Sequence, residues 1–290
     1  MRKKKRKMKR KMKRRTINWT DCLLILLVLL VALIAILPLV SVFINSLADP
    51  RAGNLIGGGA AKIIFKPYPI TYRQYYIALL ENRETTMYFA NTLRIVAPIL
   101  LFGTLFAIPS GYAFAKFDFP FKKVLFFVYV LVMLLPVQIN VVGTYIFFRN
   151  IDLVERYAGV ILPGIFSSFG AFLIYQFMKS VPDETMESAR LDGADEAKIL
   201  FQIVIPQVKA GIASMLVLIL IDSWNMVEMP MAILRDEWLY PMSIMLRYMA
   251  MTEPRIVFAC VIIFSIPLLL IFLIAQDNLT EGIARSAVIK

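Results

Sequence analysis

Hydrophobic residues in this chain gather into long runs separated by short polar segments. Residues 22–44 carry no charged side chain over 23 positions, which is long enough to cross a hydrocarbon core of roughly 30 Å. Five further apolar runs follow, each of which contains proline, a residue that spans tolerate where neighbouring helices satisfy the backbone. The pattern therefore predicts six transmembrane helices, at about 22–44, 88–114, 124–148, 158–177, 211–231 and 257–275.

Composition and charge agree with a polytopic, all-α membrane protein. The chain is 59% hydrophobic, more than soluble domains usually are. Its net charge of +12 could suggest a nucleic-acid partner, but residues 1–15 alone hold 12 Lys and Arg without interleaved aromatics. This tail precedes the first apolar run, where the positive-inside rule and anionic lipids explain it. With a cytoplasmic N-terminus, the inner segments hold 21 Lys and Arg against 10 outside, so both termini are predicted to be cytoplasmic.

Residue usage excludes several kinds of chemistry. The chain has no histidine and two cysteines, Cys22 and Cys260, which excludes histidine-based catalysis, histidine metal sites and a disulfide framework. The stretch from Gly57 to Lys62 lacks the spacing of a phosphate-binding loop. We therefore predict no catalytic, metal or cofactor site in this chain, and an energy source on another chain.

The one large polar interruption is residues 182–206, which contain six carboxylates between two apolar runs. Pro182 suits a helix start, Asp183 and Glu184 suit the positive end of a helix dipole, and the Asp192-Gly193 pair predicts a turn. A second helix is expected to reach Ile205. Small side chains between the two helices would allow the backbone of another protein to approach closely. They are Ser188, Ala189 and Ala194.

These residues carry a resemblance to a known family. Glu187-Ser188-Ala189, then Gly193 and Ile203-Val204-Ile205-Pro206, resemble the EAA signature of the membrane subunits of ABC importers, with Ser188 and Ile205 as mild departures. The resemblance implies that the loop docks as a coupling helix on an ATP-hydrolysing subunit. The implied coupling residues are Glu187, Ser188, Ala189, Asp192, Gly193 and Pro206.

Further segments resemble the carbohydrate-uptake, maltose-transporter type of permease over roughly residues 85–290. They are 111–120, 176–182, Trp224-Asn225 and 276–290. This resemblance implies a type I importer permease in a prokaryotic plasma membrane that moves a sugar or oligosaccharide. It also implies a second membrane subunit, two ATPase subunits that bind ATP and magnesium, and an external binding protein. The expected division is a basic tail 1–21, a first helix 22–44, an external loop 45–86, a permease core 87–278 with the coupling loop 182–206, and a C-terminal tail 279–290.

A polar face is expected on the fifth span. Asp222 lies about 15 Å along an ideal helix from Ile212, near the bilayer midplane, where a charge is expensive unless it faces protein or water. Asn225 and Glu228, with Ser214, share an arc of about 120° with it, and Trp224 points the opposite way. One hypothesis is that Asp222, Asn225 and Glu228 line the solute pathway. The other is that Asp222 pairs with Arg94 or with the second membrane subunit.

A different class of function remains as the alternative. A secondary transporter or channel subunit would work without ATP, but such proteins often show sequence repeats or paired broken helices, and no repeat is seen here.

Overall fold

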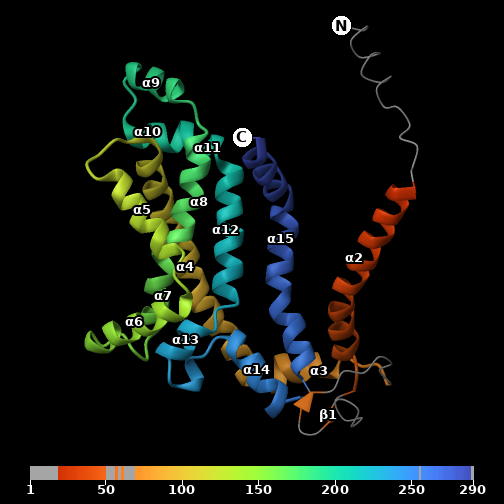
Figure 1. Cartoon of the computed structure of the whole chain (residues 1–290). Coiled ribbons are helices and arrows are strands. Elements are labelled where there is room, and N and C mark those ends of the chain that lie inside the picture. Colours follow the sequence, from red (N-terminus) through yellow and green to blue (C-terminus); the bar gives the residue numbers. More distant parts are fainter. Residues whose placement is uncertain (1–18, 50–55, 58–59, 62–68, 255, 289–290) are drawn as a thin grey trace.

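The computed structural model describes residues 19–49, 56–57, 60–61, 69–254 and 256–288. The regular elements of the described part are helices, except for a two-residue antiparallel pair, β1 (Ile56–Gly57) and β2 (Ala60–Ala61), and an isolated bridge between Ala48 and Ile70. Long helices stand side by side, with short helices at both ends (Figure 1). The predicted all-α class is confirmed. Residues 1–18 of the predicted basic tail, and residues 50–55, 58–59 and 62–68 of the predicted external loop, lie outside the described residues.

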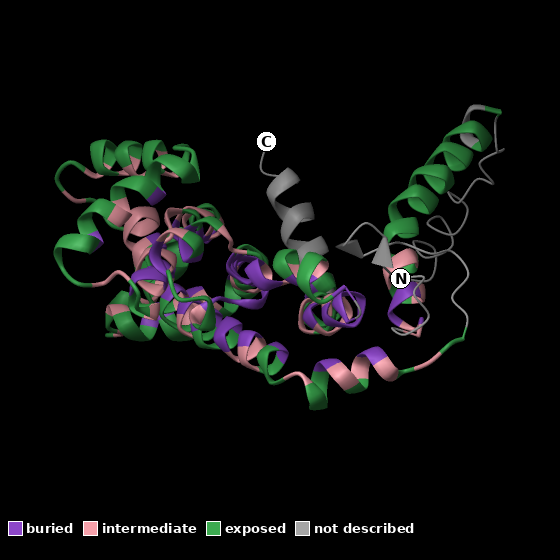
Figure 2. Cartoon of the chain, turned by 90° about the horizontal axis from the view of Figure 1, so that it is seen from below, coloured by how far each residue is buried: buried purple, intermediate pink, exposed green. Residues whose placement is uncertain are grey.

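The first span is helix α2 (Trp19–Ser46), close to the predicted 22–44. Its apolar side chains are mostly exposed, and the helix leans away from the others (Figures 1 and 2). The end of α2 is held by Gln74, whose side chain donates hydrogen bonds to the carbonyls of Asn45 (2.7 Å) and Ala48 (2.9 Å). A helix that is apolar on all sides and exposed in one chain suits contact with lipid or with another subunit.

The segment predicted as an irregular loop over 45–86 is helical in its last part. It contains α3 (Arg73–Tyr76) and the π-helix η1 (Ile77–Glu81). Helix α4 (Arg83–Lys116) then begins five residues earlier than the predicted 88, because the Asn82 side chain accepts hydrogen bonds from the first-turn amides of Glu84 and Thr85. The loop prediction was wrong for this part.

The predicted span 124–148 is not one straight helix. Helix α5 (Lys122–Met133) and helix α6 (Val137–Asn150) are bent by 101° at the break between them. Pro136 ends this break, and proline both lacks an amide donor and disfavours helical backbone in the preceding residue. The fourth span is close to its prediction and consists of α7 (Tyr157–Ile165) and α8 (Ser168–Lys179).

The polar loop leads into a second bent pair. After α9 (Asp183–Leu191), a nearly continuous helical run meets α12 (Lys209–Trp224) at 81°. The run comprises α10 (Glu196–Ile199), the π-helix η2 (Leu200–Val204) and α11 (Ile205–Gln207), so it ends two residues beyond the predicted Ile205.

Two predicted boundaries near the C-terminus were wrong. The fifth span ends at Trp224 and does not reach residue 231; α13 (Glu228–Ile233), the 3-10 helix η3 (Glu237–Leu239) and α14 (Met242–Thr252) follow. Helix α15 (Val257–Val288) continues through the predicted boundary at 279, so the C-terminal tail is not separate from the sixth span.

The number of spans depends on the two bent pairs. Within the described residues, four helices are by themselves long and apolar enough to cross a membrane, and there are six spans if each bent pair is one span. Six spans therefore result only if α5 with α6 counts as one span, and the run from α10 to α11 with α12 as another.

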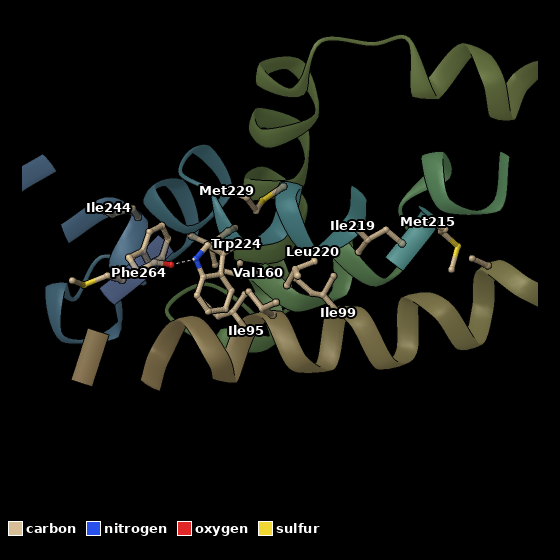
Figure 3. Packing of buried hydrophobic residues seen from close by; sticks show 14 of the residues in the cluster. Ile95, Ile99, Val160, Met215, Ile219, Leu220, Trp224, Met229, Ile244 and Phe264 are labelled. Carbon is tan, nitrogen blue, oxygen red and sulfur yellow. Dashed lines mark hydrogen bonds between the residues drawn. The ribbon is translucent and has the colours of Figure 1, made fainter. Parts of the chain in front are cut away.

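The core joins α4, α12 and α15 around Trp224. The Trp224 side chain is buried, and its indole nitrogen donates a hydrogen bond to the carbonyl of Phe264 in α15 (3.1 Å; Figure 3). Ile95 and Ile99 of α4 and Val160 of α7 lie in the same buried cluster. Trp224 is thus buried, whereas Asp222 and Asn225 on either side of it are exposed.

Candidate coupling surface and solute pathway

Helix α9 forms one end of the molecule, opposite α13 and α14 (Figure 1). It begins after Pro182, with Asp183 and Glu184 in its first turn, as predicted. The side chain of Met186 is buried, while Glu187 and Ser188 are exposed. The helix therefore leaves two of the six predicted coupling residues exposed.

Gly193 ends α9 in the left-handed conformation. Its φ is +82°, its amide donates to the carbonyl of Arg190, and the amide of Ala194 donates to the carbonyl of Ala189, both at 3.0 Å. This pair of hydrogen bonds is a Schellman motif, with Asp192 at the C-cap. Ala189 and Ala194 are partly buried and pack on this chain's own core. The small side chains that we predicted to let a partner approach thus also contact this chain's own core.

The last turn of α4 holds the coupling loop at two places. Lys116 donates to the carbonyl of Val181 and forms an ion pair with Asp183 at 2.7 Å. Tyr112 donates from its hydroxyl to one carboxylate oxygen of Glu196 at 2.8 Å.

The second carboxylate oxygen of Glu196 accepts a hydrogen bond from the Nε of Arg190 at 2.7 Å. This hydrogen bond raises the pKa of the Arg190 guanidinium above its ordinary value. Arg190 therefore stays charged at every physiological pH.

Sequence reasoning missed Leu191, the last residue of α9. Its side chain is 89% exposed, beside the turn at Gly193. An apolar residue directly before Asp192-Gly193 in a strongly polar segment was a signal that could have identified it. Pro206 lies in α11, next to the start of α12, so the structure places it apart from the residues on α9.

The predicted pathway residues lie at the opposite end of α12 from α9. Asp222 is two residues from the end of the helix, Asn225 follows that end, and Glu228 begins α13. All three are exposed, and Glu228 is close enough to Asp222 to interact with it electrostatically.

The continuous polar face expected from an ideal helix was wrong, because α12 ends before Asn225. Ser214 does not contribute to it either: the side chain is buried and donates to the carbonyl of Ala210 at 2.9 Å. Asp222 is also nearer the end of the span than the predicted midplane. Asp222 and Glu228 therefore belong to two different helices, α12 and α13, joined by a short turn.

The hypothesis that Asp222 pairs with Arg94 was also wrong. Arg94 donates to the amide oxygen of Asn91 at 3.0 Å. In the part of the chain that the structure describes, the ion pairs are Lys116–Asp183, Lys122–Asp118 and Arg190–Glu196. Asp222 therefore has no cationic partner among these described residues.

A family model described as "Binding-protein-dependent transport system inner membrane component" matches residues 85–285. The arabinooligosaccharides transport system permease protein AraQ of Halalkalibacterium halodurans is 26% identical over 254 residues, which are 87% of this chain and 90% of that protein. The sn-glycerol-3-phosphate transport system permease protein UgpE of Pectobacterium atrosepticum is 31% identical over 185 residues, which are 62% and 66% of the two chains.

Solved structures share the fold. A chain of a bacterial ABC transporter involved in the import of the acidic polysaccharide alginate superposes with a TM-score of 0.79 at 20% identity, covering 91% of this chain and 98% of that one. A chain of the alginate transporter in complex with an alginate pentasaccharide-bound periplasmic protein gives a TM-score of 0.65 at 17% identity, covering 90% and 96%.

Proposed function

Because this chain belongs to the family of binding-protein-dependent transport system inner membrane components, we propose that it forms half of the pathway by which a sugar or oligosaccharide enters the cell. The chain is a multi-pass membrane permease subunit of an ABC importer, and ATP hydrolysis belongs to separate subunits. The observation that best supports the proposal is the position of α9: an exposed helix held to α4 at one end of the spans, with exposed polar residues at the other end of α12.

The proposed assembly has a second permease subunit, two cytoplasmic ATPase subunits that bind ATP and magnesium, and an external binding protein. The named substrates of the two relatives, arabinooligosaccharides and sn-glycerol-3-phosphate, both carry hydroxyl groups. Hydroxyls donate to carboxylates such as Asp222 and Glu228 and exchange hydrogen bonds with the Asn225 amide. These three residues are therefore the proposed solute contacts on this subunit.

Copurification tests the proposed function. The tagged chain, isolated from native membranes, should bring down an ATPase subunit. The complex in vesicles should take up sugar only with ATP inside and binding protein outside. A chain that isolates alone and still moves solute down an ion gradient would instead be a secondary transporter or channel.

We also propose that both termini are cytoplasmic, which places α9 inside and η1 outside. With Cys22 and Cys260 replaced by alanine, a single cysteine at exposed Leu80 should react with an impermeant thiol reagent in intact cells. A cysteine at exposed Asp195 should react only after the membrane is opened. The reverse labelling pattern would show the opposite orientation.

A pathway role for Asp222 predicts altered uptake without loss of the complex. Asp222→Asn removes a charge that accepts hydrogen bonds, so we expect about tenfold weaker transport of the preferred solute. Glu237→Gln is the matched control, because Glu237 is also an exposed acid at this end of the molecule but lies in η3. If Asp222→Asn assembles and transports with unchanged rate and sugar preference, Asp222 does not line the pathway; loss of the complex itself would indicate a pair with the second subunit.

A further inference from the structure

The cytoplasmic end of α4 contacts the coupling loop at two separated points. Lys116 holds the start of α9 through Asp183 and the Val181 carbonyl. Tyr112 reaches the loop's second helix through Glu196, which in turn holds Arg190 near the end of α9. Asp183 and Arg190 are seven positions apart, about 10 Å along a helix. A helix held at one point can pivot, whereas one held at both ends keeps its direction.

Glu196 is the residue on which three elements converge. Its two carboxylate oxygens accept from Tyr112 of α4 and from Arg190 of α9, while Glu196 itself begins α10. Tyr112 is 4% exposed, and its hydroxyl otherwise meets only the Met186 sulfur, at 4.0 Å, among the described hydrogen bonds. Removing the carboxylate would therefore leave a buried hydroxyl without a strong acceptor, a loss that exceeds that of an exposed ion pair.

The α4 end of this network is attached to a rigid part of the fold. A Cβ added at Gly111, next to Tyr112, would lie 2.6 Å from the side chain of Ile174 and 2.9 Å from the Tyr175 amide nitrogen. Helices α4 and α8 are thus in close backbone contact directly beside Tyr112. A displacement of α9 that acts through Glu196 would move these two helices together, because close-packed interiors deform little.

We propose that Tyr112, Glu196 and Arg190 form a clamp that makes the coupling helix and α4 move as one body. The proposal rests on the proposed function, in which α9 receives the motion of an ATPase subunit. Glu196 is then a positioning residue: it contacts neither solute nor nucleotide, but fixes how motion at α9 is passed to the spans. The EAA resemblance includes neither Tyr112 nor Glu196.

Amide hydrogen exchange on the full chain tests the clamp directly. We expect Glu196→Ala to raise exchange rates in α9 by about tenfold, the change expected for losing a hydrogen bond to a charged group. Tyr112→Phe should act in the same direction, and adding it to Glu196→Ala should have little further effect, because the acceptor is already gone.

Asp118→Ala is the matched control. Like Glu196, Asp118 is a carboxylate at this end of the molecule that pairs with a cation, Lys122, at 3.3 Å, but this pair does not involve α9. Unchanged exchange in Glu196→Ala relative to Asp118→Ala would overturn the clamp.

In the assembled complex, the readout is solute transported per ATP hydrolysed. The clamp predicts that Glu196→Ala lowers this ratio by about fivefold or more, while Asp118→Ala leaves it unchanged. If Glu196 contributed only to stability, Glu196→Ala would lower the amount of complex, and with it ATP hydrolysis and transport by the same factor. An unchanged ratio of solute transported to ATP hydrolysed would therefore refute the proposal. Should the chain copurify with no ATPase, the proposed function fails, but the exchange rates still decide whether the clamp orders α9.

Discussion

Leu191→Asp is expected to remove the ATPase subunit from the purified complex. Leu191 is 89% exposed at the end of α9. Burying a leucine side chain in a partner's groove contributes about 1.5–3 kcal/mol, and an aspartate there would add the cost of an unpaired charge. Together these should weaken ATPase binding at least about 100-fold. The measurement is the ratio of ATPase to permease after affinity purification.

Leu80→Asp provides the control for this experiment. Leu80 is 72% exposed and lies in η1, near the opposite end of the molecule from α9. The same change of chemistry there should leave the ATPase bound. If Leu191→Asp retains the ATPase as well as Leu80→Asp does, Leu191 does not dock on it.

Gly193→Val is expected to abolish most coupling while the spans stay folded. The φ of +82° at Gly193 strains any residue with a Cβ, and a branched side chain costs about 1–3 kcal/mol there. The added Cβ would meet no other atom within 4 Å, so the effect comes from the backbone alone. Relief of that strain would reorient α9 against α10. We therefore expect binding-protein-stimulated ATP hydrolysis and uptake to fall by about fivefold or more.

Two variants separate backbone strain from side-chain size. Gly193→Asn should retain most activity, because asparagine adopts the left-handed conformation more readily than other residues. Gly143→Val places the same side chain in α6, where the Cβ also has open space but φ is not in the left-handed range, so transport should change little. Normal activity in Gly193→Val would show that the turn is not needed for coupling.

Reversal of charge on α9 should also impair coupling, since Glu187 is exposed on the proposed docking helix. Within the described part of the chain, Glu187 forms no ion pair, but its charge acts on Arg190 of the clamp. Glu187→Gln removes the charge without placing a cation beside Arg190, so a loss of ATPase stimulation in both Glu187→Gln and Glu187→Lys would indicate an effect on the partner interface.

Local patterns in the sequence were sufficient to predict the positions of many helices in this protein. Runs of apolar residues predicted α2, α4 and the pair α7–α8 to within a few residues, because crossing a bilayer requires about 20 apolar residues in one stretch. Proline, acidic residues and Asp192-Gly193 predicted where α9 starts and ends, because helix caps depend on neighbours a few positions away.

The bends and ends of helices were decided by tertiary structure. Pro136 signals a break, but not its 101° angle. Nothing in the apolar run after Lys209 marks Trp224 as the last residue of α12. At this helix end, the indole of Trp224 is buried and donates a hydrogen bond to the Phe264 carbonyl in α15. An ideal helical wheel therefore placed Asp222 and Glu228 on one helix. In the structure they lie on two helices, α12 and α13, with a turn between them.

The contacts that hold the coupling loop are the part that only the fold determines. Tyr112 and Glu196 are 84 residues apart, and Lys116 and Asp183 are 67 apart. Periodicity and capping rules relate residues within one or two helical turns, so they place Glu196 on a helix without indicating what its carboxylate meets. The sequence by itself determined that a polar helix–turn–helix interrupts the spans; packing of α4 against α8 determined that Tyr112 and Lys116 reach it.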